Sequence, residues 1–313
     1  MSLLEPAEAA IETPSAPPIG TEAGIGDVAP PQPLRKDVWR RFRRNKLAMF
    51  GLVFFLLLVL VAIFAPIVAP YGPTEIPKPV EVRASPSTDH WFGTDNIGRD
   101  VFSRVVYGAR ISLKIGIIAT AISLSIGVVL GALSGYFAGV TDTIVMRVTD
   151  ALLAIPYIIL AIAIAALFGR SVNSVILVLG LTGWLAIVRI VRANFMSLKQ
   201  LEYVEAARAL GYNRTRIIFK HILPNALQPI IVYGTIAIGG VILAEAALAY
   251  LGVGVQPPTP AWGLMVADGK RNISNAPWII FFPGMAIFLT VLAFVFMGDG
   301  LRDALDPKLK GRS

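Results

Sequence analysis

Six apolar runs, each long enough or nearly long enough to cross a bilayer, limit what this chain can fold into. The first run covers residues 47–68 and directly follows a cluster of basic residues. A helix needs about 20 predominantly apolar residues to span the hydrocarbon core of a membrane. The other runs are at 115–135, 151–168, 172–188, 230–251 and 278–297. They predict an all-α, polytopic membrane helical bundle with about six transmembrane helices.

The composition supports a lipid environment. The chain is 55% hydrophobic and 15% charged, whereas soluble domains have about 45–50% apolar and about 25% charged residues. It has no cysteine and only two histidines, so disulfides, iron–sulfur clusters and Cys/His zinc sites are excluded, and we expect no cofactor. The net charge is +8. Because its basic residues lie beside apolar runs, they indicate membrane topology and not nucleic-acid binding.

The chain divides into segments of different character. Residues 1–33, rich in Pro, Ala and Glu, predict a disordered tail. The segments after it are a basic stretch at 34–46, the first transmembrane helix at 47–68, a loop at 69–110, a core at 111–300 with five further transmembrane helices, and a C-terminal tail at 301–313. Within the 69–110 loop, apolar residues recur every fourth position at Ile97, Val101 and Val105, which predicts an amphipathic helix on the membrane surface from 93 to 110.

The distribution of basic residues predicts the orientation. With six spans, both termini lie on one side of the membrane. Most of the 28 Lys and Arg residues then share that side with the 192–228 loop. Cytoplasmic loops carry an excess of Lys and Arg, so we expect the termini and this loop to be cytoplasmic. The 69–110 loop is expected to be extracytoplasmic, although it also carries several basic residues.

A row of small residues marks the second span. Gly127, Gly131, Gly135 and Gly139 continue the spacing of four that begins at Ser123. Positions four apart lie on one helical face, and small residues there allow another helix to approach closely. The row predicts either packing within the chain or a contact with another subunit.

Charged residues in or beside the spans have either a functional or a structural role. Glu245 lies deep in the fifth run, where a carboxylate is costly. It is either a pathway-lining or proton-linked group, or a carboxyl that bonds a neighbouring helix or reaches the outer interface. Arg147 and Asp150 are three residues apart beside the third span, and we expect them to pair on one helical face.

The loop from residue 201 carries the most information. Good helix formers at 202–210 are followed by Gly211, which suits a helix end, and Asn213 can cap a second helix that runs to about residue 222. Pro224 and Pro229 are expected to break that helix before the fifth span. Alanines at 206, 207 and 209 give the first helix a smooth surface that can seat in a groove of another protein.

This loop resembles the signature of the permease subunits of bacterial ABC importers. Its residues are Glu205-Ala206-Ala207, Gly211 and Leu223-Pro224, and the signature isoleucine is replaced by His221. The form His-Ile-Leu-Pro-Asn is similar to the peptide and nickel branch of the binding-protein-dependent, methionine-importer-like type I family. Gly93-Thr94-Asp95, Gly98-Arg99-Asp100, Leu243-Ala244-Glu245 and the stretch 256–260 also resemble that branch. Within it, the chain is most similar to the C-type subunit of dipeptide or oligopeptide importers.

The resemblance implies a type I ABC importer permease fold in a bacterial cytoplasmic (inner) membrane. It implies a second homologous permease subunit, two cytoplasmic ATPase subunits and an extracytoplasmic substrate-binding protein as partners. It assigns coupling to the ATPase to Glu205, Ala206, Ala207, Gly211, His221, Leu223 and Pro224. The cargo it implies is a di- or oligopeptide, with a nickel complex as the alternative. The chain has no phosphate-binding Gly-x-x-x-x-Gly-Lys-Ser/Thr loop, so it is expected not to be an enzyme.

Two other classes compete with this interpretation. An ion-coupled secondary transporter could use Glu245 as its ion site, but such carriers usually contain internal repeats, and the sequence shows no clear one. A membrane-embedded enzyme would need clustered polar residues inside the spans, which the sequence lacks.

Overall fold

The computed structural model describes residues 34–305. The tail expected at 1–33 lies outside the described residues, as do residues 306–313 of the expected C-terminal tail. Within the described range, every regular element is helical, apart from one isolated bridge between Thr94 and Asp100.

Five helices of the described part are long and apolar enough to cross a membrane. Four of them are α2 (Lys46–Ile63), α4 (Val101–Phe137), α7 (Val172–Leu198) and α12 (Trp278–Leu305). The fifth is α10 (Leu223–Tyr250), to which α9 (Arg214–Arg216) and the π-helix η1 (Ile217–Ile222) are joined end to end. A sixth span is obtained if α5 (Gly139–Leu153) and α6 (Tyr157–Phe168) count as one, although they are bent by 93° relative to each other. The prediction of an all-helical membrane bundle is therefore confirmed.

Several helix boundaries differ from the predicted segments. The third span is broken at Pro156, which cannot donate a backbone hydrogen bond and precedes α6. Pro229 does not break the helix before the fifth span but lies inside α10. Residues 301–305, expected in the tail, belong to α12. The first span ends at Ile63, and a short helix α3 (Ala65–Val68) follows after Phe64.

The amphipathic surface helix expected at 93–110 does not exist as a separate element. Asp100 caps α4 by accepting a 2.7 Å hydrogen bond from Ser103 N, so residues from Val101 onward are the first turns of that long helix. Residues 93–100 form a compact turn. Its Asp95 carboxylate holds Arg99 (Nε–Oδ2 2.7 Å) and lies 3.6 Å from Arg104 of α4. These three side chains are buried, because their charges pair with one another instead of facing water.

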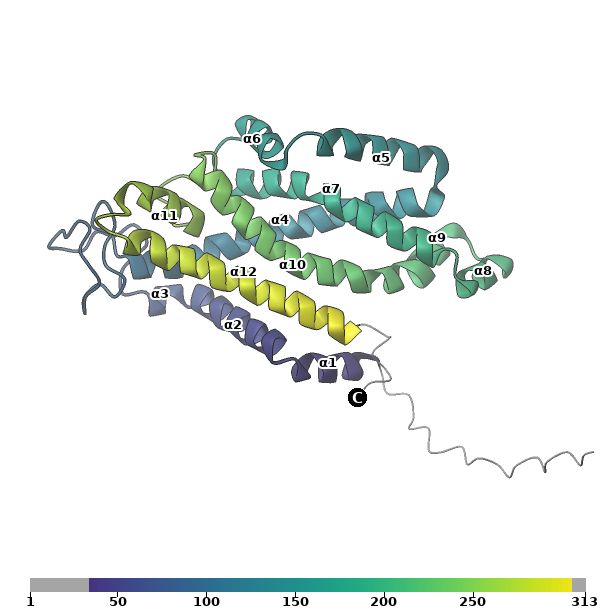
Figure 1. Cartoon of the computed structure of the whole chain (residues 1–313), viewed down its shortest axis with the longest axis horizontal. Helices are drawn as coiled ribbons and strands as arrows, with labels where there is room; N and C mark the ends of the chain where they lie inside the picture. Colours follow the sequence, from purple (N-terminus) through teal and green to yellow (C-terminus); the bar gives the residue numbers. More distant parts are fainter. Residues whose placement is uncertain (1–33, 306–313) are drawn as a thin grey trace, which may run out of the picture.

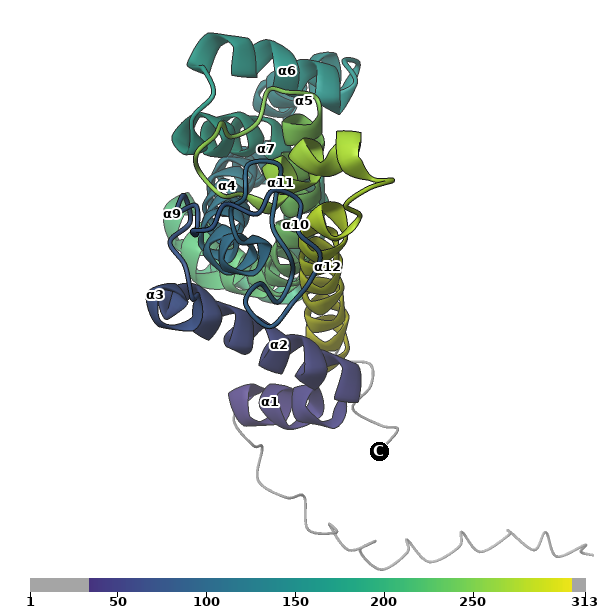
Figure 2. The same ribbon diagram turned by 90° about the vertical axis from the view of Figure 1, so that its left-hand side faces the viewer.

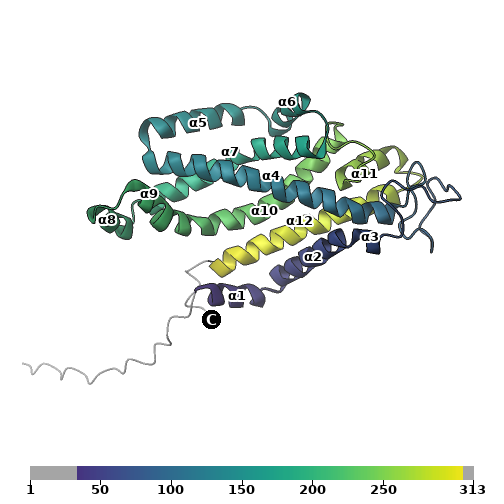
Figure 3. The ribbon, with the colours of Figure 1, turned by 180° about the vertical axis from the view of Figure 1, so that it is seen from behind.

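The long helices pack as layers (Figure 1). α5 and α6 lie along one side of the bundle, α4, α7 and α10 form its middle, and α12 and α2 lie on the other side. The view from behind shows α4 running across the bundle in front of α10 (Figure 3). The short helix α1 (Leu34–Arg44) occupies the expected basic segment, and its Phe42 packs with Ala48 and Ala304 against α2 and α12.

The glycine row of α4 faces α7. A Cβ atom on Gly127 would lie 2.6 Å from Ile187, and one on Gly131 would lie 2.7 Å from Val191. Gly135 is equally close to Phe195. Gly139 is not in this row, because it has a φ of +55° at the start of α5 and has open space around it. Close approach of two helices within the chain therefore explains the first three glycines.

The two ends of the bundle differ. One end carries α8 (Glu202–Ala209), which projects beyond the long helices (Figure 1). The other carries the loop before α4, together with α11 (Trp262–Gly269) and the 3-10 turn η2 (Lys270–Asn272), and this end faces the viewer in Figure 2. There the fully buried Trp262 donates a 2.9 Å hydrogen bond from Nε1 to the Val105 carbonyl of α4.

Candidate coupling segment and membrane pocket

The projecting helix α8 ends in a tight turn. Gly211 has a φ of +76°, a conformation that glycine adopts without strain, and its N–H donates to the Arg208 carbonyl at 3.0 Å. The Tyr212 N–H donates to the Ala207 carbonyl at 3.2 Å. Asn213 then accepts a 2.8 Å hydrogen bond from Arg216 N at the start of α9. These contacts form the helix–turn–helix expected from the sequence.

One face of α8 is anchored and the other is free. Val204 and Ala207 are buried in a cluster with Ile217 and Ile222. Glu205 and Ala206 are exposed, as is Ala209. Ala207 therefore does not belong to the smooth outer alanine surface, because it faces inward. The remaining outer residues form a small surface on a helix that is held firmly from behind.

The other sequence-predicted coupling residues lie at the end of η1 and the start of α10. The half-buried His221 ring stacks on Tyr212 with centroids 5.8 Å apart, and the His221 carbonyl accepts 2.8 Å from Asn225 Nδ2. Leu223 is half-buried, and Pro224 is exposed in the first turn of α10. Partial burial of Tyr203 on α8 raises the pKa of its phenol. These residues connect α8 to the long helix α10.

Glu245 is fully buried on α10. Neither carboxyl oxygen has a hydrogen bond of normal geometry to any described residue, and Oε2 lies against the Gly263 backbone of α11. The structure thus turns Glu245 toward α11, at the end of the bundle opposite α8. It does not line the pocket described next.

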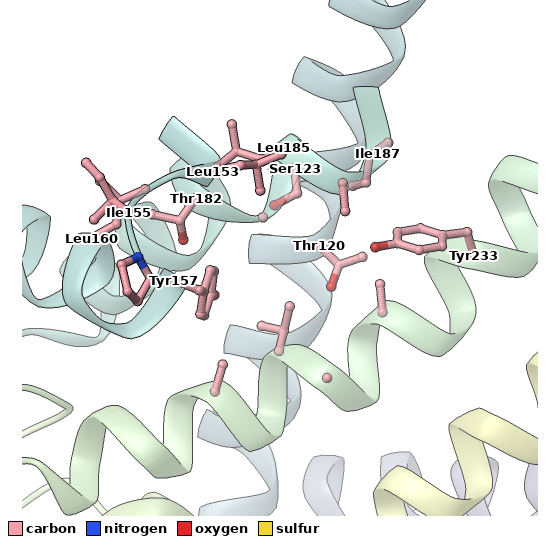
Figure 4. Close-up of a pocket in the computed structure, with 17 residues that line it drawn as sticks. Thr120, Ser123, Leu153, Ile155, Tyr157, Leu160, Thr182, Leu185, Ile187 and Tyr233 are labelled. Atoms are coloured by element: carbon pink, nitrogen blue, oxygen red, sulfur yellow. The ribbon is translucent and has the colours of Figure 1, made fainter. Parts of the chain in front are cut away.

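A cavity of about 350 Å³ lies where α5 and α6 are broken apart. α4, α7 and α10 supply its other walls, and Figure 4 shows the residues that line it. Among residues 34–305, no Asp, Glu, Lys, Arg or His lines this cavity. Its polar side chains there are hydroxyls, namely those of Thr120, Ser123, Tyr157, Thr182 and Tyr233. Its chemistry is therefore that of neutral hydrogen bonding inside an apolar wall.

The hydroxyls of the cavity differ in their partners. Ser123 Oγ donates to the Gly180 carbonyl at 2.9 Å, and Thr182 Oγ1 donates to the Val178 carbonyl at 2.8 Å. Thr120 is 3% exposed, and its Oγ1 has no hydrogen-bond partner among the described residues. The Tyr233 hydroxyl of α10 points toward Thr120 across the cavity (Figure 4). The sequence reasoning missed these residues; Pro156, in the middle of a predicted span, was the signal that could have indicated them.

The bundle, its projecting helix and the cavity at a broken span define a polytopic membrane transport subunit. The chain belongs to the family of binding-protein-dependent transport system inner membrane components, whose model matches residues 127–311. Residues 33–86 match the N-terminal transmembrane domain of oligopeptide transport permease C. The chain is thus a multi-pass permease subunit of an ABC importer and not itself an enzyme.

Individual relatives agree with this assignment. The chain is 44% identical to the dipeptide transport system permease protein DppC of Alkalihalophilus pseudofirmus, over 88% of this chain and 90% of that protein. It is 46% identical to the glutathione transport system permease protein GsiD of Escherichia coli, over 88% of this chain and 91% of that protein. The inward-facing MetNI methionine ABC transporter matches with a TM-score of 0.54 at 20% identity, over 65% of this chain and 97% of that chain. This last likeness shows the type I importer fold.

Proposed function

We propose that this permease forms half of the translocation pathway of an importer for di- or oligopeptides. The names of its relatives support this cargo, since they are a dipeptide and a glutathione permease and glutathione is itself a short peptide. A nickel complex is the alternative cargo. The neutral cavity is compatible with a peptide, because it offers hydroxyls and an apolar wall.

The proposed orientation puts the α8 end in the cytoplasm. The basic helix α1 and the C-terminal end of α12 lie toward the same end as α8 (Figure 1). The excess of Lys and Arg on this side supports a cytoplasmic location. The loop before α4 and α11 then face the extracytoplasmic binding protein.

The observation that carries the proposed mechanism is the half-anchored helix α8. Its exposed residues, Glu205 and Ala206, would contact an ATPase subunit, while Val204 and Ala207 fix it to the bundle. A partner that bound α8 equally well in all states would transmit no free energy. We infer two ATPase subunits and one second permease in the assembly, with Glu205, Ala206 and Gly211 at the contact and Ala207, His221, Leu223 and Pro224 behind it.

Copurification tests the assembly. The C-terminally tagged chain is extracted from native membranes in mild detergent, and its partners are identified by mass spectrometry. A second permease and ATPases support the proposal, and recovery of the chain alone, where other membrane complexes survive, contradicts it. The intact complex is then placed in liposomes with its binding protein. ATP-dependent uptake of a labelled dipeptide, but not of a nickel complex, is the expected result.

A further inference from the structure

The break between α5 and α6 leaves backbone groups without helical partners. The first-turn amides of α6, starting at Tyr157, have no carbonyl one turn earlier in the helix. At membrane depth, non-helical backbone is tolerated where it is buried in protein or lines a water-filled cavity. The cavity borders Pro156 and Tyr157, where α6 begins.

The Thr120 hydroxyl also lacks the partner that comparable residues have. Threonines of other long helices donate to the carbonyl four residues earlier, as Thr182 does to Val178 and Thr290 does to Ala286. Thr120 makes no such bond and is buried at the cavity wall. Leaving a buried hydroxyl unpaired destabilises the protein. An occupant of the cavity that pairs with Thr120 would remove this destabilisation.

The remaining wall restricts the kind of occupant. A hydroxyl both donates and accepts, so Thr120 and Tyr233 can serve the N–H and the C=O of an amide. On the α10 side, the small residues Ala237, Gly240 and Ala244 lie beside Tyr233 and Val241. These small residues offer no specific contact to a side chain of a bound molecule. An uncharged lining would also give no ion pair to a charged terminus.

We propose that this cavity is a binding site for the peptide backbone of the cargo during its passage. Thr120 and Tyr233 exchange hydrogen bonds with one amide group of the substrate, while substrate side chains contact the apolar wall without selection. This site rests on the proposed function, namely that the cargo is a short peptide. It explains how one pathway can accept different side chains after the binding protein has delivered its ligand.

The experiment compares two substrates in the reconstituted complex with its binding protein. One is dialanine, and the other is the same dipeptide with a methyl group on the amide nitrogen, which removes the N–H donor. The ratio of their uptake rates is measured for the wild type and for Thr120→Val with Tyr233→Phe. Because the binding protein is the same in both complexes, its own preference cancels when the two ratios are compared.

We expect the double variant to reduce this ratio about threefold to tenfold, as for the loss of one neutral hydrogen bond. Thr120→Ser, which keeps the hydroxyl, should retain the wild-type ratio, whereas the single variant Thr120→Val should lose part of it. This pair distinguishes loss of the hydroxyl from a general effect of substitution at this position. Thr235→Val is the matched control on α10, since the Thr235 hydroxyl bonds its own helix at Ile231. An unchanged ratio with normal dialanine import overturns the backbone site alone. Failure of the wild type to import any peptide overturns the cargo as well.

Discussion

Arg192 of α7 holds Asp142 of α5 through two parallel hydrogen bonds, Nε to Oδ1 at 2.5 Å and Nη2 to Oδ2 at 2.6 Å. Such bidentate, charge-assisted pairs are stronger than single neutral hydrogen bonds. We expect Asp142→Ala and Arg192→Ala each to lower the free energy of unfolding by about 1–2 kcal/mol. The double variant should lose little more than either single one. Thermal unfolding in detergent measures these effects.

The control for this pair is Arg189→Ala. Arg189 bonds Asp150 at 2.6 Å, but both side chains are more than half exposed, so its loss should change the stability by less than about 1 kcal/mol. Losses at Asp142 and Arg192 that simply add would show that the two residues act independently.

Gly131 should not tolerate a methyl group. A Cβ atom there would lie 2.7 Å from Val191 and 2.8 Å from the Val188 carbonyl, so α4 and α7 would have to separate. We expect Gly131→Ala to cost about 1–3 kcal/mol of stability. Gly284→Ala in α12 has open space and should be neutral or stabilising, because alanine favours a helix over glycine by about 1 kcal/mol. Equal melting temperatures for the two variants would refute the packing role of Gly131.

We expect a substitution of Gly211 to act through backbone strain and not through a steric clash. No described atom lies within 4 Å of an added Cβ, but the backbone of a residue other than glycine would be strained at this φ of +76°. Gly211→Val should displace α8 and reduce ATP-driven uptake at least tenfold while the protein stays in the membrane. Gly211→Asn should keep most activity, because asparagine tolerates this conformation. If both variants transport normally, the α8 turn has no part in coupling.

Glu205→Lys reverses the charge on the exposed face of α8. Because Glu205 is exposed, we expect unchanged stability, weaker recovery of the ATPase subunits in copurification and loss of coupled uptake. Glu202→Lys, also exposed on α8, is the neighbouring control, and the sequence motif does not include it. An equal loss in both variants would indicate a general charge effect instead of a contact at Glu205.

Glu245→Gln separates an ATP-driven permease from an ion-coupled carrier. Glutamine has nearly the same shape, so uptake should remain ATP-dependent and should not respond to collapse of the proton gradient. Glu245→Ala should instead lower the melting temperature, because it leaves a cavity beside Gly263. Uptake that depends on the proton gradient in the wild type and loses this dependence in Glu245→Gln would favour the carrier.

Local signals in the sequence were sufficient for much of this fold. Long apolar runs identified the membrane helices, and Gly211 and Asn213 identified the turn after α8, because capping depends on residues close in sequence. Partners distant in sequence could not be deduced. Asp150 was expected to pair with Arg147, three residues away, but bonds Arg189 of α7. The segment at 93–110 was misjudged for the same reason, since Arg104 is buried beside Asp95 instead of facing water.

The candidate pocket was less predictable than the coupling segment. Thr120, on α4, and Tyr233, on α10, are far apart in sequence, and neither belongs to a recognisable motif. Only the packing of α4, α7 and α10 around the break between α5 and α6 brings their hydroxyls to the same cavity. Proline at 156 indicates a break in a span, but it does not indicate which helices enclose that break.

The continuous path from α9 through η1 to α10 has a mechanical consequence. Its 37 residues, from Arg214 to Tyr250, follow a bent helical path roughly 55 Å long at about 1.5 Å per residue. A helix of this length can amplify a movement at one of its ends. A tilt of about 5° at the α8 end would move the far end by about 5 Å over this length. A small displacement beside α8 is thus large enough, at the opposite surface, to widen or narrow an opening.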